Sequence, residues 1–360
     1  NTGGGSTSAF NDNLTLTGNA TFASNNRWDI IGDFDMGGFT LTKIGNGAVY
    51  LKNTDLINTG SLDISAGDLY LEVNTDYDSA GTITVRNGAR LAFNRNDTTH
   101  DVDVLLEDGG GIFARSFGGA NSVPVIGGDV TLVGGTATFD TNNTLSGGTS
   151  SLTIDGIVSG PGAIVKVGGE ALILNGANTY IGTTSVNAGS LLVNGTHTGG
   201  GDYAVAGGAV LGGDGTIDAE VVVNGILATG DPATAAGVGD LTVEGNIAIN
   251  NQFQFEIDGA NSDTLLVTIP TDTITLGGSS TLIVTDPTDP DAAATILVID
   301  NAGDDAIIGT FAGLAEGATV TSQDGNEYTI SYVGGDGNDV VLFEGAAETN
   351  VDLSGGVLTI

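Results

Sequence analysis

The sequence predicts a nearly all-β fold in which short coils of chain stack on one another. Three observations lead to this fold class. Between residues 160 and 195, short apolar segments recur about every ten residues, and a glycine or asparagine corner closes each one. The chain contains 60 glycines but only 6 prolines, a composition typical of short strands and tight corners. Long stretches rich in Ala, Glu, Lys and Leu, as in helices, are missing.

One unit of strand and corner cannot bury its own apolar face, so each unit must stack on its neighbours. Apolar residues make up 40% of the chain, which is enough for a continuous core and argues against disorder. We therefore expect one elongated body rather than two or three separate domains.

The chain opens with a flexible lead, which we place at residues 1–12 because glycine, serine and threonine dominate it. Strands follow from residue 13, and Trp28, Phe34 and Phe39 crowd into the first coils. An end coil has one open face and needs bulky side chains to close it, so we interpret these aromatic residues as a cap or first core layer. The alternative is a platform on which Trp28 and Phe34 contact a glycan.

Internal repeats extend the solenoid over residues 13–249. Lys43 precedes a Gly-x-Gly corner much as Lys166 precedes Gly168, and both follow an apolar strand. Residues 66–71 and 87–91 reproduce the pattern of residues 187–192. Two coils are thus recognisable twice, which predicts that the same architecture covers the N-terminal third.

From about residue 250 the strands lengthen, alternate strictly and are separated by acidic loops. We interpret residues 250–344 as antiparallel β-structure that closes the C-terminal end, because an uncovered end exposes strand edges. Residues 345–360 form a linker and a terminal strand, with Val351, Leu353, Val357 and Ile360 as candidates for self-assembly. This strand is expected either to be cut from a longer protein or to pair with a neighbouring subunit.

A family resemblance rests on the run from Gly162 to Gly195, which includes Lys166, Gly168, Leu172, Leu174, Asn178-Thr179-Tyr180, Gly189 and Val193-Asn194-Gly195. This run closely resembles the autotransporter-associated β-strand repeat. The resemblance implies a right-handed parallel β-helix and a place in the passenger region of a large bacterial surface protein. It does not fix an activity, because one fold serves many functions.

The charge of the chain excludes several partners. Forty-four acidic residues stand against eight basic ones, giving a net charge of −36, and every Lys and Arg lies at or before residue 166. Such a surface repels nucleic acid and anionic lipid.

The chain has no cysteine and no run of eighteen apolar residues, so we expect no disulfide and no membrane insertion by this segment. Any signal peptide or anchor is expected to have been removed or to lie outside it.

Residues 334–342 match the G-G-x-G-x-D-x-U-x nonapeptide that binds calcium in stacked coils. Carboxylates are suitable ligands for Ca²⁺, so Asp336 and Asp339 are the candidate metal ligands. One copy supplies half of a site, and the alternative is a glycine-rich hairpin between two strands.

Three pairs of carboxylates at strand spacing are candidates for cleaving a polysaccharide: Asp33 with Asp35, Asp76 with Asp78, and Asp101 with Asp103 beside His100. Such pairs arise readily by chance in so acidic a chain. The chain also lacks a cysteine nucleophile, a G-x-S-x-G elbow and a phosphate loop before a helix. We therefore expect no catalytic residues, no organic cofactor and no enzyme activity.

The first functional hypothesis is a non-enzymatic, extracellular structural or adhesive β-helix of a bacterial cell surface, which assembles end to end into a filament or matrix. Its partners are then other copies of itself, or extracellular matrix and glycans. The alternatives are a β-helix that binds or cleaves polysaccharide, and a calcium-ordered module of a larger secreted protein.

Overall fold

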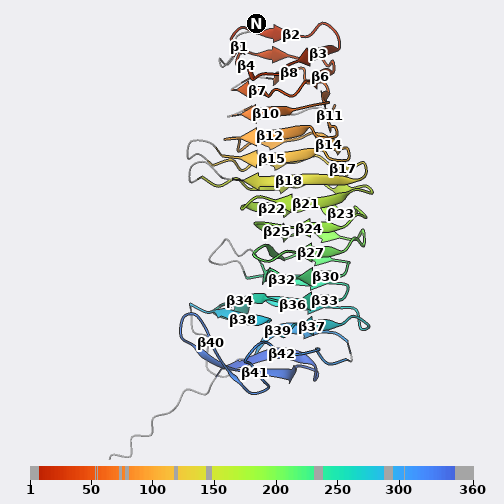
Figure 1. Cartoon of the computed structure of the whole chain (residues 1–360). Helices are drawn as coiled ribbons and strands as arrows, with labels where there is room; N and C mark the ends of the chain where they lie inside the picture. The colour runs from red at the N-terminus through yellow and green to blue at the C-terminus, as the bar shows by residue number, and fades with distance from the viewer. Residues whose placement is uncertain are drawn as a thin grey trace, which may run out of the picture.

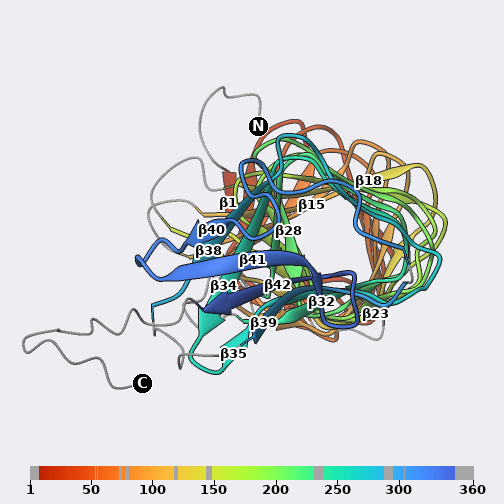
Figure 2. The same cartoon turned by 90° about the horizontal axis from the view of Figure 1, so that it is seen from below.

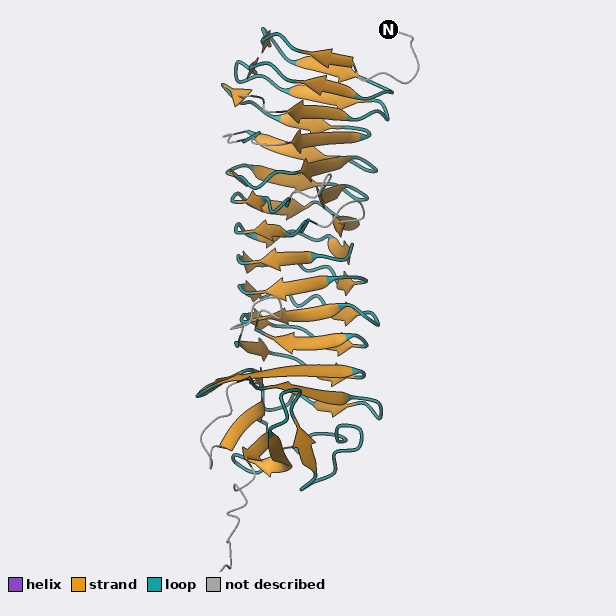
Figure 3. Ribbon diagram, turned by 90° about the vertical axis from the view of Figure 1, so that its left-hand side faces the viewer, coloured by secondary structure: helices purple, strands orange, loops and turns teal. Residues whose placement is uncertain are grey.

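The computed structural model describes residues 8–52, 54, 56–72, 75–77, 81–116, 121–142, 148–230, 238–287, 295–303 and 305–344. None of these residues lies in a helix, and Figure 3 shows an elongated stack of strands joined by short loops. The prediction of an all-β solenoid is therefore confirmed.

One long sheet runs the length of the stack, and thirteen of the described strands belong to it. In order along the sheet they are β1 (Ser8–Phe10), β4 (Trp28–Ile30), β7 (Val49–Lys52), β10 (Asp68–Glu72), β12 (Arg90–Asn94), β15 (Gly111–Arg115), β18 (Thr136–Asn142), β21 (Ala163–Val167), β24 (Thr184–Val186), β27 (Tyr203–Val205), β30 (Val221–Val223), β33 (Ile247–Ile249) and β37 (Ile274–Leu276). We call it the first face.

After every described strand of the first face except β10, the chain forms a strand of a second face. The described strands of this second face form two sheets. The shorter holds β2 (Leu14–Thr15), β5 (Phe34–Asp35) and β8 (Leu56–Ile57). The longer holds β13 (Thr99–His100), β16 (Val125–Ile126), β19 (Leu152–Ile154), β22 (Ala171–Leu174), β25 (Ser190–Val193), β28 (Val210–Gly213), β31 (Ile226–Thr229), β34 (Gln252–Asp258), β35 (Asn261–Ser262) and β38 (Thr281–Thr285).

The third face also consists of two sheets among the described residues. One holds β3 (Ala20–Ala23), β6 (Leu41–Ile44), β9 (Leu62–Ile64), β11 (Thr82–Val85), β14 (Asp103–Leu106), β17 (Val130–Leu132) and β20 (Val158–Ser159). The other holds β23 (Ala177–Asn178), β26 (Thr196–His197), β29 (Thr216–Ile217), β32 (Asp240–Val243), β36 (Thr264–Val267), β39 (Thr295–Asn301), β40 (Thr319–Thr321), β41 (Glu327–Gly334) and β42 (Asp339–Glu344).

The strands of successive coils pair in parallel, and the molecule is a right-handed parallel β-helix (Figure 1). Along each strand the side chains alternate between the interior and the outside, as in β18 and β34. Stacking in register places like residues above one another. On the second face one buried column consists of Leu152, Leu172, Leu191, Leu211, Leu227 and Phe253. Burying each such side chain contributes roughly 1.5–3 kcal/mol.

Glycines at the corners allow the coils to approach closely. A Cβ atom built on Gly195 would lie 2.0 Å from the carbonyl oxygen of Gly176, and one on Gly215 would lie 1.9 Å from that of Gly195. A Cβ atom on Gly176 would likewise lie 2.2 Å from the carbonyl oxygen of Gly156. Since any other side chain would collide with the backbone of the preceding coil, this column accounts for part of the high glycine content.

The repeated motifs do not occupy the same face in the two parts of the stack. Lys43 lies on β6 of the third face, whereas Lys166 lies on β21 of the first face. Thr99–His100 similarly lies on the second face and Thr196–His197 on the third. The strand-and-corner unit has therefore advanced by one face between the N-terminal and central coils. Longer coils lie between them, such as the one that separates Asp108 from Thr136 by 28 residues.

The C-terminal end is closed by the antiparallel strands β39, β42, β41 and β40. Figure 2 shows β41 and β42 crossing this end of the stack. Parallel coils continue beyond residue 249, the predicted boundary, because β34 pairs in parallel with both β31 and β38, and β36 with β39. At the other end, β1 pairs with β4, so residues 8–10 of the predicted flexible lead belong to the first coil.

Candidate functional site

Three aromatic rings gather at the N-terminal end. The ring of Phe10 on β1 stacks on that of Trp28 with 5.1 Å between centroids, and Phe22 meets Trp28 edge-on at 5.9 Å. Trp28 is half-buried and Phe10 remains 38% exposed. Phe34 is 0% exposed and belongs to the core. It therefore cannot contact a glycan, and the prediction of a glycan platform is wrong for this residue.

A second aromatic group lies on the outward side of the first face. Tyr50, Tyr70, Ala92 and Phe113 stand in register on four successive strands and form a cluster apart from the core. The rings of Tyr50 and Tyr70 are parallel, with 4.2 Å between centroids. We call this group the outer row.

Arginine side chains cover the outer row. The guanidinium carbon of Arg27 lies 3.8 Å from the ring centroid of Tyr50. Those of Arg90 and Arg115 lie 4.7 and 4.8 Å from the ring centroid of Phe113. A guanidinium over an aromatic face gains cation–π attraction and shields the ring from water. Burial also raises the pKa of Tyr50 and of Tyr70, so both phenols are neutral at physiological pH.

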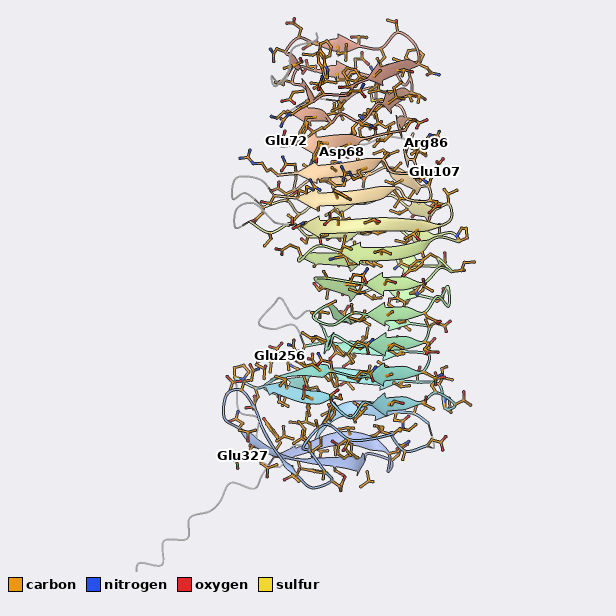
Figure 4. All side chains as sticks on the ribbon, in the orientation of Figure 1. Asp68, Glu72, Arg86, Glu107, Glu256 and Glu327 are labelled. Carbon is orange, nitrogen blue, oxygen red and sulfur yellow. The ribbon has the colours of Figure 1, made fainter. Side chains whose placement is uncertain are left out.

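Carboxylates pair with these cations. The ion pairs on this side are Arg27–Asp29 (2.7 Å), Lys52–Asp29 (3.4 Å), Lys52–Glu72 (3.3 Å) and Arg90–Asp68 (2.5 Å). Figure 4 shows Asp68 and Glu72 on this side and the Arg86–Glu107 pair on another. These pairs join three basic side chains to three acidic ones. Arg115 is a fourth cation beside Phe113, and Asp140, next in register, is a fourth carboxylate, so this side is nearly neutral on a highly acidic molecule.

Sequence reasoning missed the outer row. Its signal is the alternation in β10 and β12, where outward Asp68, Tyr70 and Arg90 alternate with buried leucines. The row becomes visible only when the register between coils is known, because its members are about twenty residues apart in the sequence.

The predicted calcium ligands lie in a hairpin between β41 and β42. Gly334 pairs with Asp339, and the turn between them contains Gly335 and Gly337 with φ of 53° and 125°, which favour glycine. Asp339 is 6% exposed and accepts a hydrogen bond of 2.9 Å from the backbone N–H of Asn301. The structure thus shows the alternative hairpin that the sequence predicted.

Metal binding by this hairpin stays a prediction. Burial, together with Asp339 and Asp336, raises the pKa of Asp300, so three carboxylates act on one another here. The described residues contain no group of three or more His, Cys, Asp or Glu that could hold a metal ion.

The carboxylate pairs considered for catalysis bind neighbouring coils. Asp33 accepts a hydrogen bond from Asn13 (3.0 Å), and Asp35 accepts one from Asn58 (3.0 Å). His100 is 1% exposed, and its Nδ1 accepts a hydrogen bond from the N–H of Tyr77.

Several residues predicted from the sequence lie outside the described residues: Asp78, Val351, Leu353, Val357 and Ile360. No helix in the described part of the chain is long and apolar enough to cross a membrane.

The profile of the passenger-associated-transport-repeat family matches residues 164–193. These residues run from β21 to β25 and thus make up more than one full coil of the β-helix. The chain carries an autotransporter-associated repeat. Over 122 residues the chain is also 38% identical to the adhesin BmaC autotransporter of Brucella suis biovar 1 (strain 1330). This alignment covers 30% of the chain and 4% of the adhesin, so the chain spans a small part of that relative's length.

The polar side chains of the passenger-associated repeat are structural. Lys166 is 0% exposed, and its amine donates hydrogen bonds to the carbonyls of Val167, Gly168 and Ala188, at 3.0, 3.0 and 2.9 Å. Lys43 binds the carbonyls of Gly45 and Ala66 in the same way. Each lysine joins its own corner to the corner of the next coil. Burial lowers the pKa of Lys166 to about 8.

A buried hydrogen-bond network joins the repeat to the residues that follow it. The hydroxyl of Tyr180 lies 2.7 Å from that of Thr184 and 2.9 Å from that of Tyr203, and Tyr203 contacts Nδ1 of His197 at 3.1 Å. The other ring nitrogen of His197 lies 2.8 Å from the carbonyl oxygen of Tyr180. Burial lowers the pKa of His197, so the ring is neutral and fixed inside the core. These residues hold the shape of the rod.

Proposed function

We propose that this protein is a non-enzymatic, extracellular rod that displays an adhesive side at a bacterial cell surface. The observation that carries the proposal is the passenger-associated repeat within a parallel β-helix. The 38% identity to an autotransporter adhesin supports it. The buried histidines and lysines support a mechanical role as well, because they bond within and between coils and are closed to substrate.

The outer row is the surface that we assign to adhesion. Its buried rings support guanidinium groups, which have further hydrogen-bond donors, and its charge is nearly neutral on a molecule that otherwise repels anionic partners. Aromatic residues and arginine are enriched where proteins bind one another. Extracellular matrix proteins and surface glycans are the proposed partners.

The test is an adhesion assay with beads that carry the full chain, on immobilised matrix proteins and on a glycan array. We expect binding by the wild type, and loss of most of it when Arg27, Arg90 and Arg115 are replaced by glutamine together. The matched control replaces Arg86 by glutamine, because Arg86 lies on another side of the rod. Equal binding by both variants would show that the adhesive surface lies elsewhere on the rod. No binding by the wild type would contradict the proposed adhesive function.

The alternative is a β-helix that binds or cleaves polysaccharide. The partly exposed ring of Trp28 and the guanidinium groups over the outer row favour binding over cleavage, since they suit sugar contacts without a reactive group. A reducing-sugar assay on acidic and neutral polysaccharides separates these activities. We expect no release of sugar, and any release that Asp33→Asn or Asp103→Asn abolishes would establish the enzyme.

A further inference from the structure

The four cations beside the outer row lie on two lines that follow the axis of the rod. Arg27 precedes β4 and Arg90 begins β12, and the register of the first face places both on one line. Lys52 ends β7 and Arg115 ends β15, and both lie on the other line. The aromatic side chains stand between the two lines. On each line the second cation lies three strands from the first, which is about 14 Å at about 4.8 Å between strands.

The arginines, and not their carboxylate partners, form the outer layer of this side. The side chains of Arg27 and Arg90 are 42% and 41% exposed, whereas those of Asp29 and Asp68 are 8% and 15% exposed. Each arginine uses Nε and Nη2 to bind both oxygens of its carboxylate. Among the described residues, no hydrogen bond engages the Nη1 group of either arginine. These groups are therefore outward donors, and the carboxylate and the ring beneath each guanidinium hold them in place.

Charge limits the partner to an uncharged one. A carboxylate lies 2.7 Å from Arg27 and another lies 2.5 Å from Arg90, so each guanidinium charge is already balanced while a donor remains. The whole chain carries a net charge of −36 and repels a polyanion that approaches this side. The surface therefore suits a partner that is rich in oxygen acceptors and carries no charge.

Spacing distinguishes between the chains that could lie along the rod. Such a chain meets a new strand of the first face about every 4.8 Å. A peptide strand repeats its groups on one side about every 6.8 Å, so it falls out of step with the strands below it. A sugar unit of an extended glycan advances by about one strand spacing and carries ring, glycosidic and hydroxyl oxygens. The glycan therefore stays in step with the rod.

We propose that an uncharged, extended glycan lies along the rod axis over the outer row, with one sugar unit on each strand from β4 to β15. This inference rests on the proposed adhesive function and names the partner class of that site. The Nη1 groups of Arg27 and Arg90 donate hydrogen bonds to the glycan oxygens on one side, and Lys52 and Arg115 donate on the other. The strands β4, β7, β10, β12 and β15 follow one another in the sheet (Figure 1), so a pentasaccharide fills the site.

The experiment titrates the full chain with two uncharged series, β-1,4-linked oligosaccharides of glucose and of N-acetylglucosamine, from disaccharide to hexasaccharide, by calorimetry. We expect the affinity for one series to rise by about tenfold or more from disaccharide to pentasaccharide, because each unit adds hydrogen bonds. It should not rise further at the hexasaccharide. Since no net charge is exchanged, the affinity should stay within about twofold between about 0.05 M and about 0.5 M NaCl.

Variants at the end and in the middle of the site test its position. Arg115→Gln removes the cation at the β15 end, so the affinity should stop rising at the tetrasaccharide. Arg90→Gln and Arg90→Lys should both weaken the pentasaccharide by about tenfold, because lysine keeps the charge but lacks the planar fork. Arg86→Gln is the matched control, since Arg86 lies on another side of the rod. Circular dichroism and melting curves confirm that each variant is folded, and Arg27→Gln tests the β4 end if Arg115→Gln is unfolded.

Three outcomes would overturn the inference. Binding restricted to sulfated or uronate glycans, retained in Arg90→Lys and weakened by salt, would assign the site to anions. An unchanged dependence on chain length in both end variants would place the glycan elsewhere on the rod. No binding of either uncharged series would remove the partner class. Adhesion to matrix proteins is measured separately, so the proposed adhesive function stands or fails independently of these results.

Discussion

The N-terminal coils and the central coils bury similar cores but are joined differently on the outside. In the N-terminal third, the outward side of the first face carries Tyr50, Tyr70, Arg90 and their acidic partners. In the central coils, the outward positions in register with Asp68 and Arg90 are Ser185, Ala204, Val222 and Ala248, none of which is charged. The backbone hydrogen bonds between parallel strands thus hold the coils together whether or not the outward side chains are charged. The outward residues can therefore differ from one part of the stack to another.

The corners show the same contrast. Central corners bond through side-chain amides, as between Asn194 and Asn175 (3.2 Å), and through the close contact of Gly195 with Gly176. N-terminal coils add ion pairs such as Arg86 with Asp63 and Glu107. A Cβ on Gly60 of the N-terminal coils would also lie 2.0 Å from the carbonyl oxygen of Phe39. We infer that close approach joins the coils in both parts, and that the N-terminal coils add charge to it. The following predictions test that difference, from the largest expected effect to the smallest.

The largest effect should come from closing a central corner. In Gly195→Ala the new Cβ would lie 2.0 Å from the carbonyl oxygen of Gly176, so the coils must move apart. We expect a loss of about 3 kcal/mol in the free energy of unfolding, measured by urea denaturation. Gly169→Ala is the control, because a Cβ there meets nothing within 4 Å. Equal urea midpoints for the two variants would show that the close contact between coils at Gly195 does not determine the stability of the central coils.

A buried lysine should give a smaller effect that depends on pH. Lys166→Met leaves three corner carbonyls without their donor but also removes a buried charge, so we expect a net loss of about 1 kcal/mol at pH 7. The pKa of Lys166 is lowered from 10.5 to about 8 in the folded state. Between these values the unfolded chain holds the extra proton, so the stability of the wild type rises with pH in this window.

The stability gap between the wild type and Lys166→Met should therefore widen by about 2 kcal/mol between pH 7 and pH 9.5. Lys43→Met tests the same joint in the N-terminal coils, where burial also lowers the pKa of the lysine and two carbonyls accept its hydrogen bonds. Urea denaturation at several pH values measures both gaps. A gap that narrows above pH 8 would contradict the assigned pKa shift.

The outer ion pairs should contribute less. Arg90→Gln removes the pair with Asp68 and the contact with Phe113, and we expect a loss of about 1 kcal/mol because the arginine is partly exposed. Part of that loss should disappear at about 1 M NaCl, where charges are screened. Arg95→Gln is the control, since Arg95 is exposed and outside the outer row. Thermal melting at low and high salt measures both variants, and a loss unchanged by salt would assign the effect to packing alone.

Calcium should have the smallest effect. One nonapeptide supplies half of a site, so we expect weak binding by Asp336 and Asp339, and about 0.4 kcal/mol of stabilisation when calcium equals its dissociation constant. Melting curves in Ca²⁺, in Mg²⁺ and in EDTA measure it, with Mg²⁺ as the control for charge screening. The calcium effect should vanish in Asp336→Asn. Identical curves in Ca²⁺ and Mg²⁺ would remove the calcium hypothesis.

The fold was predictable from the sequence because its signals are local. Apolar alternation and glycine corners lie within a few residues of each other and predicted an all-β stack of coils, and the resemblance of residues 162–195 to the autotransporter-associated repeat implied the β-helix. The cap was predicted as antiparallel strands, but its start was placed too early because strict alternation also suits the last parallel coils, β34 and β38. Alternation reports burial on one side and says nothing of strand direction.

The candidate site was less predictable. Phe34 and Trp28 have similar sequence surroundings, yet Phe34 is in the core and Trp28 lies partly at the surface. The outer row escaped notice because Tyr50, Tyr70 and Phe113 meet only across coils. The repeat motifs also suggested equivalent positions for Lys43 and Lys166, whereas the structure places them on neighbouring faces.

By itself, the sequence determined that coils stack, which side chains face inward and where corners form, because each of these depends on neighbouring residues. Only the tertiary structure decided which residues meet between coils: the ring of Tyr50 stacks on that of Tyr70, and the guanidinium group of Arg90 lies over the ring of Phe113. The physical reason is register. Each coil has its own length, and the accumulated offsets set which outward side chains of successive coils become neighbours.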